Sequence, residues 1–202
     1  MRRFVNPGNT AFEVAVNSQI YVDKTGLLAY TNSVINTKQA LICSSRPRRF
    51  GKSITADMLC AYYSRGCDSD SIFASYEIAK SDSYKKYLNQ YDVIYLDIQW
   101  CMMDAGSAEQ TVSYLNYHVI EELKEIYPQI LLDGIRTAYG AMSCINAQTG
   151  VKFIVIIDEW DVLIRDEAAN EAVLQDYINF LRGMFKGSEP TKFIALAYLT
   201  GI

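Results

Sequence analysis

The feature that most constrains this chain is a stretch in which a short apolar run enters a basic loop and the loop passes directly into a helix. The stretch reads ALICSSRPRRFGKS over residues 40–53, and Ile54, Met58 and Leu59 follow at helical spacing. Strand, loop, Gly-Lys-Ser and helix in this order are typical of a phosphate-binding P-loop. We expect backbone amides and the positive end of the helix dipole to converge there on one concavity that attracts a triphosphate.

In this loop we expect Lys52 to reach the β- and γ-phosphates and the Ser53 hydroxyl to ligate Mg²⁺. The pattern is incomplete because Arg46 stands five residues before Gly51, where the full motif has glycine, and because Pro47 has no amide donor. The alternative is a basic turn that caps a helix, with a solvated lysine. The predicted nucleotide-binding residues are Arg46, Pro47, Arg48, Arg49, Phe50, Gly51, Lys52, Ser53 and Ile54.

A second apolar run, over residues 153–157, ends in the two acids Asp158 and Glu159. Such a run predicts a strand buried on both faces of a parallel sheet, and acids at its carboxyl end lie where ligands bind in open α/β sheets. We expect Asp158 to hold Mg²⁺ through a water and Glu159 to orient and deprotonate the attacking water. The alternative is a pair of polar residues that merely ends a strand. Together with the upstream Gly-Lys-Ser, the pair favours nucleotide binding.

Four sequence blocks carry a resemblance to a known family. They are YVDKT at 21–25, SRPRRFGKS at 45–53, IDEWD at 157–161 and LTGI at 199–202. These blocks resemble the AAA-ATPase-like family of bacterial proteins, whose members often carry a PD-(D/E)XK-type nuclease domain at the C-terminus. The resemblance spans nearly the whole chain, and the RPRRFGKS block is its most specific part, so Arg46 looks like a family trait. Trp160 stands where the family is expected to have tyrosine, and both side chains are aromatic.

The resemblance implies an α/β fold of the ASCE-type, AAA-like P-loop NTPases, with a mostly parallel sheet flanked by helices. It implies ATP and Mg²⁺ as cofactors, and it places the strand after Pro190 between the P-loop strand and the Asp158 strand. Thr200 at the end of that strand would then be a polar sensor of the γ-phosphate, although a simple turn residue before Gly201 is the alternative. The predicted catalytic residues are Glu159, Lys52 and Thr200, and the predicted metal ligands are Ser53 and Asp158.

We expect two parts in the chain, a lead-in segment over residues 1–38 and a P-loop ATPase core over residues 39–202. The first 20 residues predict a loose structure, residues 20–22 a short strand, and Asp23 the cap of a helix over 24–31. The YVDKT block either lines the adenine side of the pocket or has a packing role. We expect the core to be incomplete: it stops after the sensor-like strand, without a further strand beside the P-loop strand, a lid subdomain or a nuclease domain.

Hydrophobic periodicity predicts the remaining elements. They are a helix from Lys52 to Tyr63, a helix around 83–88, a strand over 91–98, a helix from a Ser107–Gln110 capping box to Pro128, a helix over 129–145, a helix from Asp166 or Glu167 to Phe185, and a strand over 192–199. Strands that alternate with helices predict a parallel sheet with right-handed crossovers. Asp97 near the end of the second strand either approaches the metal or, more commonly, just ends the strand.

Composition limits the classes of function. The net charge of −4 gives no general reason to expect nucleic-acid binding, and basic residues are dense only in the loop at 46–52. Five scattered cysteines argue for reduced thiols, and the single histidine, His118, argues against histidine-based metal sites and triads. No apolar run approaches membrane-spanning length and no signal-peptide core follows the start, so we expect a cytoplasmic protein without a membrane partner.

The sequence therefore favours a domain that binds ATP and hydrolyses it with Mg²⁺. An alternative of another class is a nucleotide-dependent regulatory switch that hydrolyses slowly or not at all and controls an associated nuclease or partner. A further alternative is a nucleic-acid-binding module that grips a phosphate backbone with the basic loop. Besides ATP, the sequence leaves open a homo-oligomer and contact with nucleic acid through a C-terminal nuclease domain.

Overall fold

A four-stranded sheet organises the computed structural model, which describes residues 2–47, 49–166 and 169–202. All neighbouring strands are parallel, in the spatial order β1 (Leu41–Ser45), β4 (Ile194–Gly201), β3 (Phe153–Asp158) and β2 (Asp92–Asp97). The predicted α/β P-loop fold is confirmed. So is the placement of the strand after Pro190 between the P-loop strand and the Asp158 strand.

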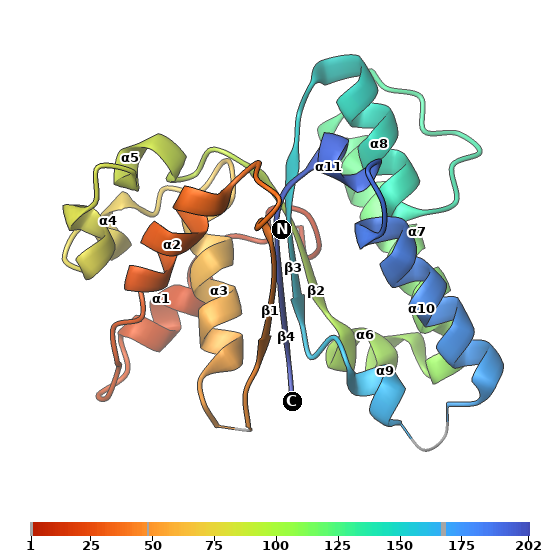
Figure 1. Ribbon diagram of the computed structural model, residues 1–202, viewed down its shortest axis with the longest axis horizontal. Coiled ribbons are helices and arrows are strands. Elements are labelled where there is room, and N and C mark those ends of the chain that lie inside the picture. The colour runs from red at the N-terminus through yellow and green to blue at the C-terminus, as the bar shows by residue number, and fades with distance from the viewer. Residues whose placement is uncertain (1, 48, 167–168) are drawn as a thin grey trace.

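Helices cover both faces of the sheet, which Figure 1 shows edge-on between them. One face carries α1 (Thr10–Val16), α2 (Gly26–Val34), α3 (Lys52–Tyr63), α4 (Asp70–Phe73), the 3₁₀ turn η1 (Glu77–Lys80) and α5 (Tyr84–Tyr87). The other carries α6 (Ile98–Ala105), α7 (Ala108–Ile126), α8 (Ala138–Thr149), α9 (Val162–Arg165), α10 (Glu171–Phe185) and α11 (Pro190–Phe193). No helix in the described ranges is long and apolar enough to cross a membrane.

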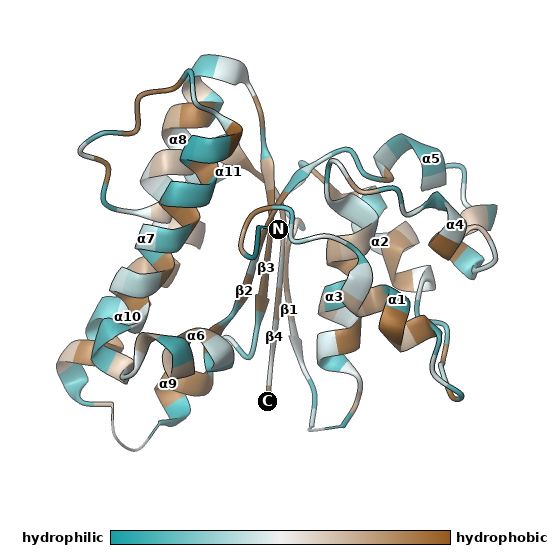
Figure 2. Cartoon of the chain, turned by 180° about the vertical axis from the view of Figure 1, so that it is seen from behind, coloured by the Kyte–Doolittle hydropathy of each residue, from teal (hydrophilic) through white to brown (hydrophobic). Residues whose placement is uncertain are grey.

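The central strand β3 shows why two helix layers form. Its residues alternate between two hydrophobic cores, with Ile154 and Ile156 facing the α3 layer and Phe153, Val155 and Ile157 facing the α7 layer. Successive side chains of a strand point to opposite faces, so an uninterrupted apolar run needs cover on both sides. Figure 2 shows the consequence, brown apolar strands enclosed between two sets of helices.

The parallel arrangement brings the carboxyl ends of all four strands to one edge. Ser44 on β1 pairs with Thr200 on β4, and Asp97 on β2 pairs with Asp158 on β3. This edge lies at the bottom of Figure 1, where the chain also passes from β1 into α3. The register therefore places polar residues from four separate segments in one row.

The first 20 residues are packed against the fold, so the expected loose structure is wrong. Val5 bridges Ile94 at the β2 edge in an antiparallel sense, and Phe4, Val5 and Phe12 are buried. Residues 20–22 form no strand. Helix α2 starts later than predicted because Asp23 accepts a hydrogen bond from the Thr25 amide (2.8 Å) and holds the chain in a turn. The domain boundary at residue 39 stays a prediction.

Three predicted boundaries in the middle of the chain also differ. Asp97 accepts the Trp100 amide (2.9 Å) and caps α6, a helix that was not anticipated, so β2 ends one residue earlier than expected. Ser107 precedes α7 but its side chain makes no capping bond, so the predicted capping box is absent. The next helix starts at Ala138 instead of residue 129, because Thr137 accepts the Gly140 amide and caps it there.

Two boundaries near the C-terminal end are shifted as well. The helix expected from Asp166 or Glu167 begins at Glu171, where Asn170 caps it. The short helix α9 precedes it. Glu167 lies outside the described residues. The last strand runs over Ile194–Gly201 instead of 192–199, because Pro190 starts the one-turn helix α11. Thr200 consequently lies inside β4.

Candidate functional site

The loop between β1 and α3 contains two left-handed residues on either side of Phe50. Gly51 (φ +70°, ψ +34°) is left-handed and precedes the first turn of α3, and Arg49 (φ +69°) is left-handed as well. Left-handed residues next to a helix start turn successive amides toward one concavity. Arg46 is not left-handed, and its amide donates to the Gly201 carbonyl (3.1 Å). The absence of glycine at position 46 therefore causes no backbone strain there. Arg48 lies outside the described residues.

A lysine from the YVDKT block braces this loop. Lys24 Nζ donates to the Phe50 carbonyl at 2.7 Å, and a Cβ on Gly51 would lie 2.7 Å from the same nitrogen. Asp23 accepts the amides of Thr25 and Glu77, which fixes the block against η1. These contacts favour the packing role of the block, and no local sequence signal pointed to the Lys24–Phe50 contact.

Lys52 connects the loop to the acids of β3. Its side chain is 7% exposed, and Nζ donates to the carbonyls of Arg46 (3.1 Å) and Pro47 (3.3 Å). The same nitrogen lies 3.8 Å from Glu159 Oε1. The P-loop lysine and the strand-end glutamate therefore meet at one edge of the sheet, as their predicted roles require.

The other described residues of the predicted nucleotide site, apart from Gly51, face solvent. Arg46, Pro47, Arg49, Phe50, Ser53 and Ile54 are all exposed. Ser53 occupies the first turn of α3, and its hydroxyl makes no hydrogen bond with the described residues. An exposed, uncommitted hydroxyl at a helix start is available to a ligand, so the position of Ser53 agrees with the role predicted for it.

Asp158 and Thr200 form a buried polar pair beside these residues. Asp158 is 2% exposed and Thr200 1% exposed. Asp158 Oδ1 accepts the Thr200 hydroxyl at 2.5 Å and the Glu159 amide at 3.0 Å, whereas Oδ2 accepts no hydrogen bond from the described residues. One oxygen of the carboxylate is thus fixed and the other remains free for a ligand.

This donor set fits Mg²⁺. The Ser53 hydroxyl and the Asp158 carboxylate offer oxygen alone, which is what Mg²⁺ prefers. No group of three or more His, Cys, Asp or Glu side chains within the described ranges is arranged to enclose a metal ion. A cation here would take most of its ligands from water and phosphate, which is how Mg²⁺ is commonly held at nucleotide sites.

Glu159 adopts an unusual backbone conformation. Its φ is +51°, a left-handed value that costs a non-glycine residue about 1 kcal/mol. The turn is held by the Trp160 amide, which donates to the Thr200 carbonyl at 3.0 Å. Non-glycine residues kept in such conformations cluster at functional sites.

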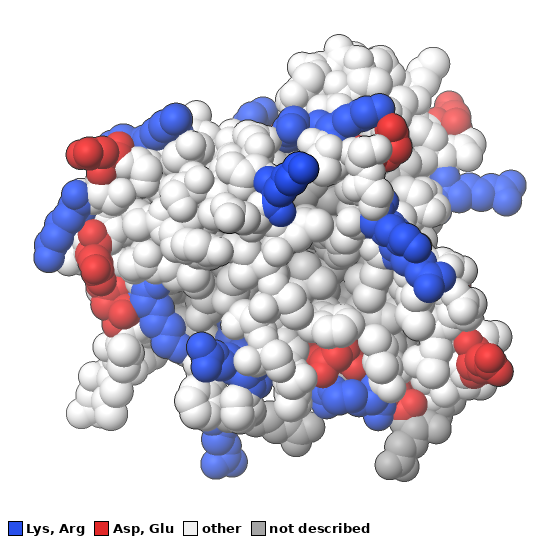
Figure 3. Space-filling model, viewed as in Figure 1, with Lys and Arg blue, Asp and Glu red and all other residues white. Residues whose placement is uncertain are grey.

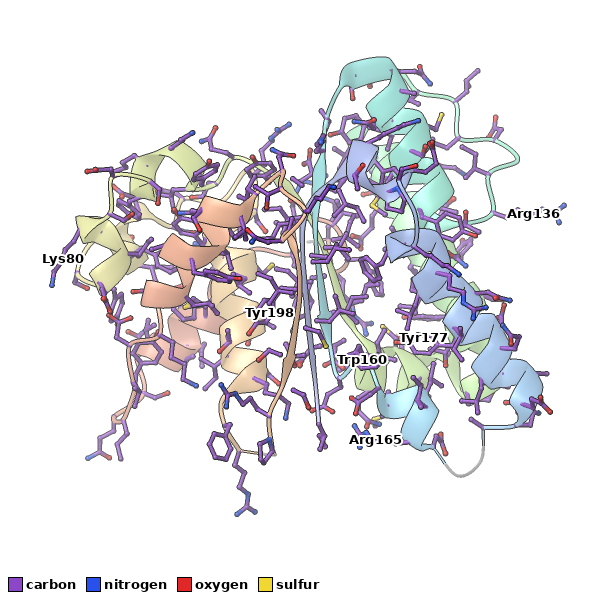
Figure 4. The ribbon with its side chains drawn as sticks, viewed as in Figure 1. Lys80, Arg136, Trp160, Arg165, Tyr177 and Tyr198 are labelled. Atoms are coloured by element: carbon purple, nitrogen blue, oxygen red, sulfur yellow. The ribbon has the colours of Figure 1, made fainter. Side chains whose placement is uncertain are left out.

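Two residues near Glu159, Arg165 and Asp161, were not among the predicted site residues. Arg165 Nη2 donates to Glu159 Oε2 (3.0 Å), and Arg165 Nε donates to Asp161 Oδ2 (2.7 Å). Figure 4 shows Arg165 and Trp160 on α9 and the turn before it, close to the carboxyl edge of the sheet. The i,i+4 spacing of Asp161 and Arg165 was a usable helical signal. No sequence signal marked the contact between Arg165 and Glu159, because that contact depends on the turn after β3.

A second group of acids adjoins the site on the β2 side. Asp57 of α3 has its pKa raised to about 6, chiefly by burial and further by the charges of Asp158 and Asp97, although the Tyr95 hydroxyl donates to Asp57 Oδ1 at 3.3 Å and opposes the rise. Burial also raises the pKa of Asp97. Both carboxyls line a cavity of about 330 Å³ whose wall includes Trp100. Asp97 caps a helix, so the simpler strand-end interpretation describes its position.

The surface around the site carries charges of both signs. Figure 3 shows basic and acidic side chains interspersed on this face, including its lower edge. A nucleic-acid backbone is usually gripped by a continuous basic stripe. The face in view therefore gives no support to the nucleic-acid alternative.

Comparison with known proteins agrees with the family resemblance of the sequence blocks. No curated protein matches this sequence. A family model described as "Predicted AAA-ATPase" matches residues 8–202, a range that includes the P-loop, both acids of β3 and Thr200. The chain belongs to the AAA-ATPase-like family.

Proposed function

We propose that this domain binds ATP with Mg²⁺ at the carboxyl edge of the sheet and hydrolyses it. The observation that carries the proposal is the 3.8 Å separation between Lys52 Nζ and Glu159 Oε1. A phosphate-binding lysine and a candidate base, contributed by elements far apart in the sequence, thereby flank one space. The family match supports nucleotide binding in general, and the site geometry supports this particular assignment of roles.

Binding would begin at the start of α3. Amides of the loop and the helix dipole attract the phosphates. Lys52 would leave the carbonyls of Arg46 and Pro47 for phosphate oxygens, because charged acceptors make stronger hydrogen bonds than neutral ones. The Ser53 hydroxyl and Asp158 Oδ2 would hold the metal, and Mg²⁺ when bound neutralises charge on the β- and γ-phosphates.

Glu159 would activate the attacking water. Once Lys52 has turned to the phosphates, Oε1 is free to orient a water molecule and accept its proton. Thr200 would keep Asp158 oriented through the 2.5 Å hydrogen bond before nucleotide binds. Its place at the carboxyl end of β4 would let it act as the sensor of the γ-phosphate. Lys52 would stabilise charge that develops during the transfer.

Two variants test the assignment. Lys52→Ala should weaken binding of a fluorescent ATP analogue by at least about 100-fold, since contacts with a charged phosphate contribute several kcal/mol. Glu159→Gln should bind normally and lose about 10²–10⁴-fold in turnover. Lys192→Ala, which removes an exposed ion pair with Glu189, is the matched control. Wild-type binding and hydrolysis in both site variants would overturn the proposal.

A slow nucleotide switch is the second candidate, and one observation favours it. Glu159 is held by both Lys52 and Arg165 in this structure, so the base is committed until a nucleotide draws the lysine away. A switch of this kind would bind ATP tightly and turn over far below the range of about 1–100 s⁻¹ that is typical of kinases. Single-turnover hydrolysis, followed with enzyme in excess over labelled ATP, separates the two candidates.

A further inference from the structure

We propose that Arg165 is a positioning residue, which holds the Glu159 carboxylate in line with the attacking water. The inference rests on the hydrolysis proposed above and adds a residue outside the four family-like blocks. Arg165 is the last residue of α9, the one-turn helix that follows β3. Its guanidinium contacts two acids of the same turn, which makes it the link between them.

Arg165 is itself firmly placed. Nε donates to Asp161 Oδ2 at 2.7 Å, and Nη2 lies 3.4 Å from Asp161 Oδ1 and 3.0 Å from Glu159 Oε2. A planar guanidinium with two fixed contacts has little freedom left for the third. The direction from which Arg165 approaches Glu159 is therefore set by Asp161.

Asp161 is anchored in turn to the end of β4. It is 6% exposed, and Oδ2 also accepts the Ile202 amide at 3.3 Å. A Cβ on Gly201 would lie 2.6 Å from Asp161 Oδ1 and 2.7 Å from Trp160 Nε1, so the strand end and this turn are in close contact. The anchor of Arg165 therefore rests against the strand that bears Thr200.

Glu159 needs such support. Its side chain is 26% exposed and extends from a turn instead of a helix or strand. Its other cationic contact among the described residues is Lys52, which would move to the phosphates. When Lys52 leaves, Arg165 is the cation that remains within 4 Å of Glu159 among the described residues. Its hold on Oε2 leaves Oε1, the oxygen nearer the P-loop, for water.

The competing explanation is a helix-stabilising ion pair. In that case the Asp161–Arg165 pair at i,i+4, with Arg165 partly exposed and Asp161 buried, would only stabilise the fold. Its loss would lower thermal stability and would leave the chemical step unchanged. The two explanations predict different kinetics, because misplacement of a base by about 1 Å costs up to about 10²-fold in rate.

The test compares Arg165→Ala with Arg136→Ala, whose arginine extends into solvent away from the site in Figure 4. In Arg165→Ala we expect kcat for ATP to fall about 10–100-fold, with KM and the affinity for a fluorescent ATP analogue within about twofold of wild type. Arg136→Ala should match wild type in all three. Guanidinium at about 20 mM, far below unfolding concentrations, should restore part of the lost kcat in Arg165→Ala and none in Glu159→Gln.

The outcomes separate this inference from the proposed function. If the wild-type protein hydrolyses ATP and Arg165→Ala has an unchanged or higher kcat, the positioning role is overturned and the proposed hydrolysis stands. Equal losses in kcat and nucleotide affinity, without guanidinium rescue, also overturn it. A wild-type protein that binds ATP without turnover overturns the proposed hydrolysis and this inference together. If Arg165→Ala does not fold, Arg165→Lys takes its place, because lysine keeps the charge without the planar guanidinium. A wild-type kcat in Arg165→Lys would then overturn the inference.

Discussion

Thr200 donates its hydroxyl to Asp158 Oδ1 at 2.5 Å, and both side chains are almost completely buried. This bond joins the ends of β4 and β3, the two central strands of the sheet. A buried carboxylate that loses a hydrogen-bond donor still pays the cost of its removal from water. The pair therefore affects both the stability of the fold and the orientation of Asp158 in the site.

Thr200→Val tests that pair. Removal of the hydroxyl at nearly constant volume should lower the free energy of unfolding by about 1–3 kcal/mol, because Asp158 Oδ1 keeps only the Glu159 amide. Urea denaturation followed by circular dichroism measures the change. Thr200→Ser retains the donor and serves as control. Equal stability of the valine and serine variants would contradict the energetic role of the hydroxyl.

Gly51→Ala should disturb the P-loop in two ways. The left-handed φ of +70° costs alanine about 1 kcal/mol, and the new Cβ would displace Lys24 Nζ. We expect a loss of stability together with a loss of nucleotide affinity. Gly66→Ala is the matched control, because Gly66 has φ +85° with no atom within 4 Å of its added Cβ. It should lose stability and bind ATP normally; equal affinities in the two variants would refute the loop-specific effect.

Lys24→Met should loosen the loop without removal of any predicted phosphate ligand. The variant loses the 2.7 Å bond to the Phe50 carbonyl, and a hydrogen bond from a charged group contributes about 1.5–3 kcal/mol when it is well ordered. Because this bond is exposed, we expect a smaller effect, about 3–10-fold in ATP affinity by calorimetry. Lys38→Met, an exposed lysine in the turn before β1, is the control. An unchanged affinity in Lys24→Met would show that the brace is dispensable.

Asp57→Asn should change the pH dependence of stability. The folded-state pKa of Asp57 is raised from its usual 3.8 to about 6 by burial, so the folded state binds more protons than the unfolded state between these values. Asp57 therefore lowers the free energy of unfolding progressively as pH rises from about 4 to 6, by roughly 3 kcal/mol at most.

The amide introduced by Asp57→Asn would remain neutral and could still accept the Tyr95 hydroxyl. The variant should therefore match wild type near pH 4 and exceed its stability above pH 6. Thermal unfolding measured between pH 4 and 7.5 tests this, with the exposed Asp82→Asn as control. A constant difference across that range would rule out the titration of Asp57 as the cause.

The local parts of the fold were predictable from the sequence. The apolar run at 153–157 predicted a doubly buried strand, and the step from an apolar run to Gly51 and a helical pattern predicted β1, the loop and α3. These signals are local because side-chain periodicity and the backbone freedom of glycine act over a few residues. Helix starts were less predictable, since Asp97 and Thr137 cap helices at positions that periodicity alone does not mark.

By itself, the sequence determined the α/β class, the P-loop and the residue types offered to phosphate and metal, because each depends on neighbouring residues. The tertiary structure alone decided that Lys24 reaches Phe50, that Arg165 reaches Glu159, and that Phe4 and Phe12 belong to the core. The physical reason is the crossover topology: β4 lies between β1 and β3, and this placement makes neighbours of segments whose separation in the chain leaves no periodic signal.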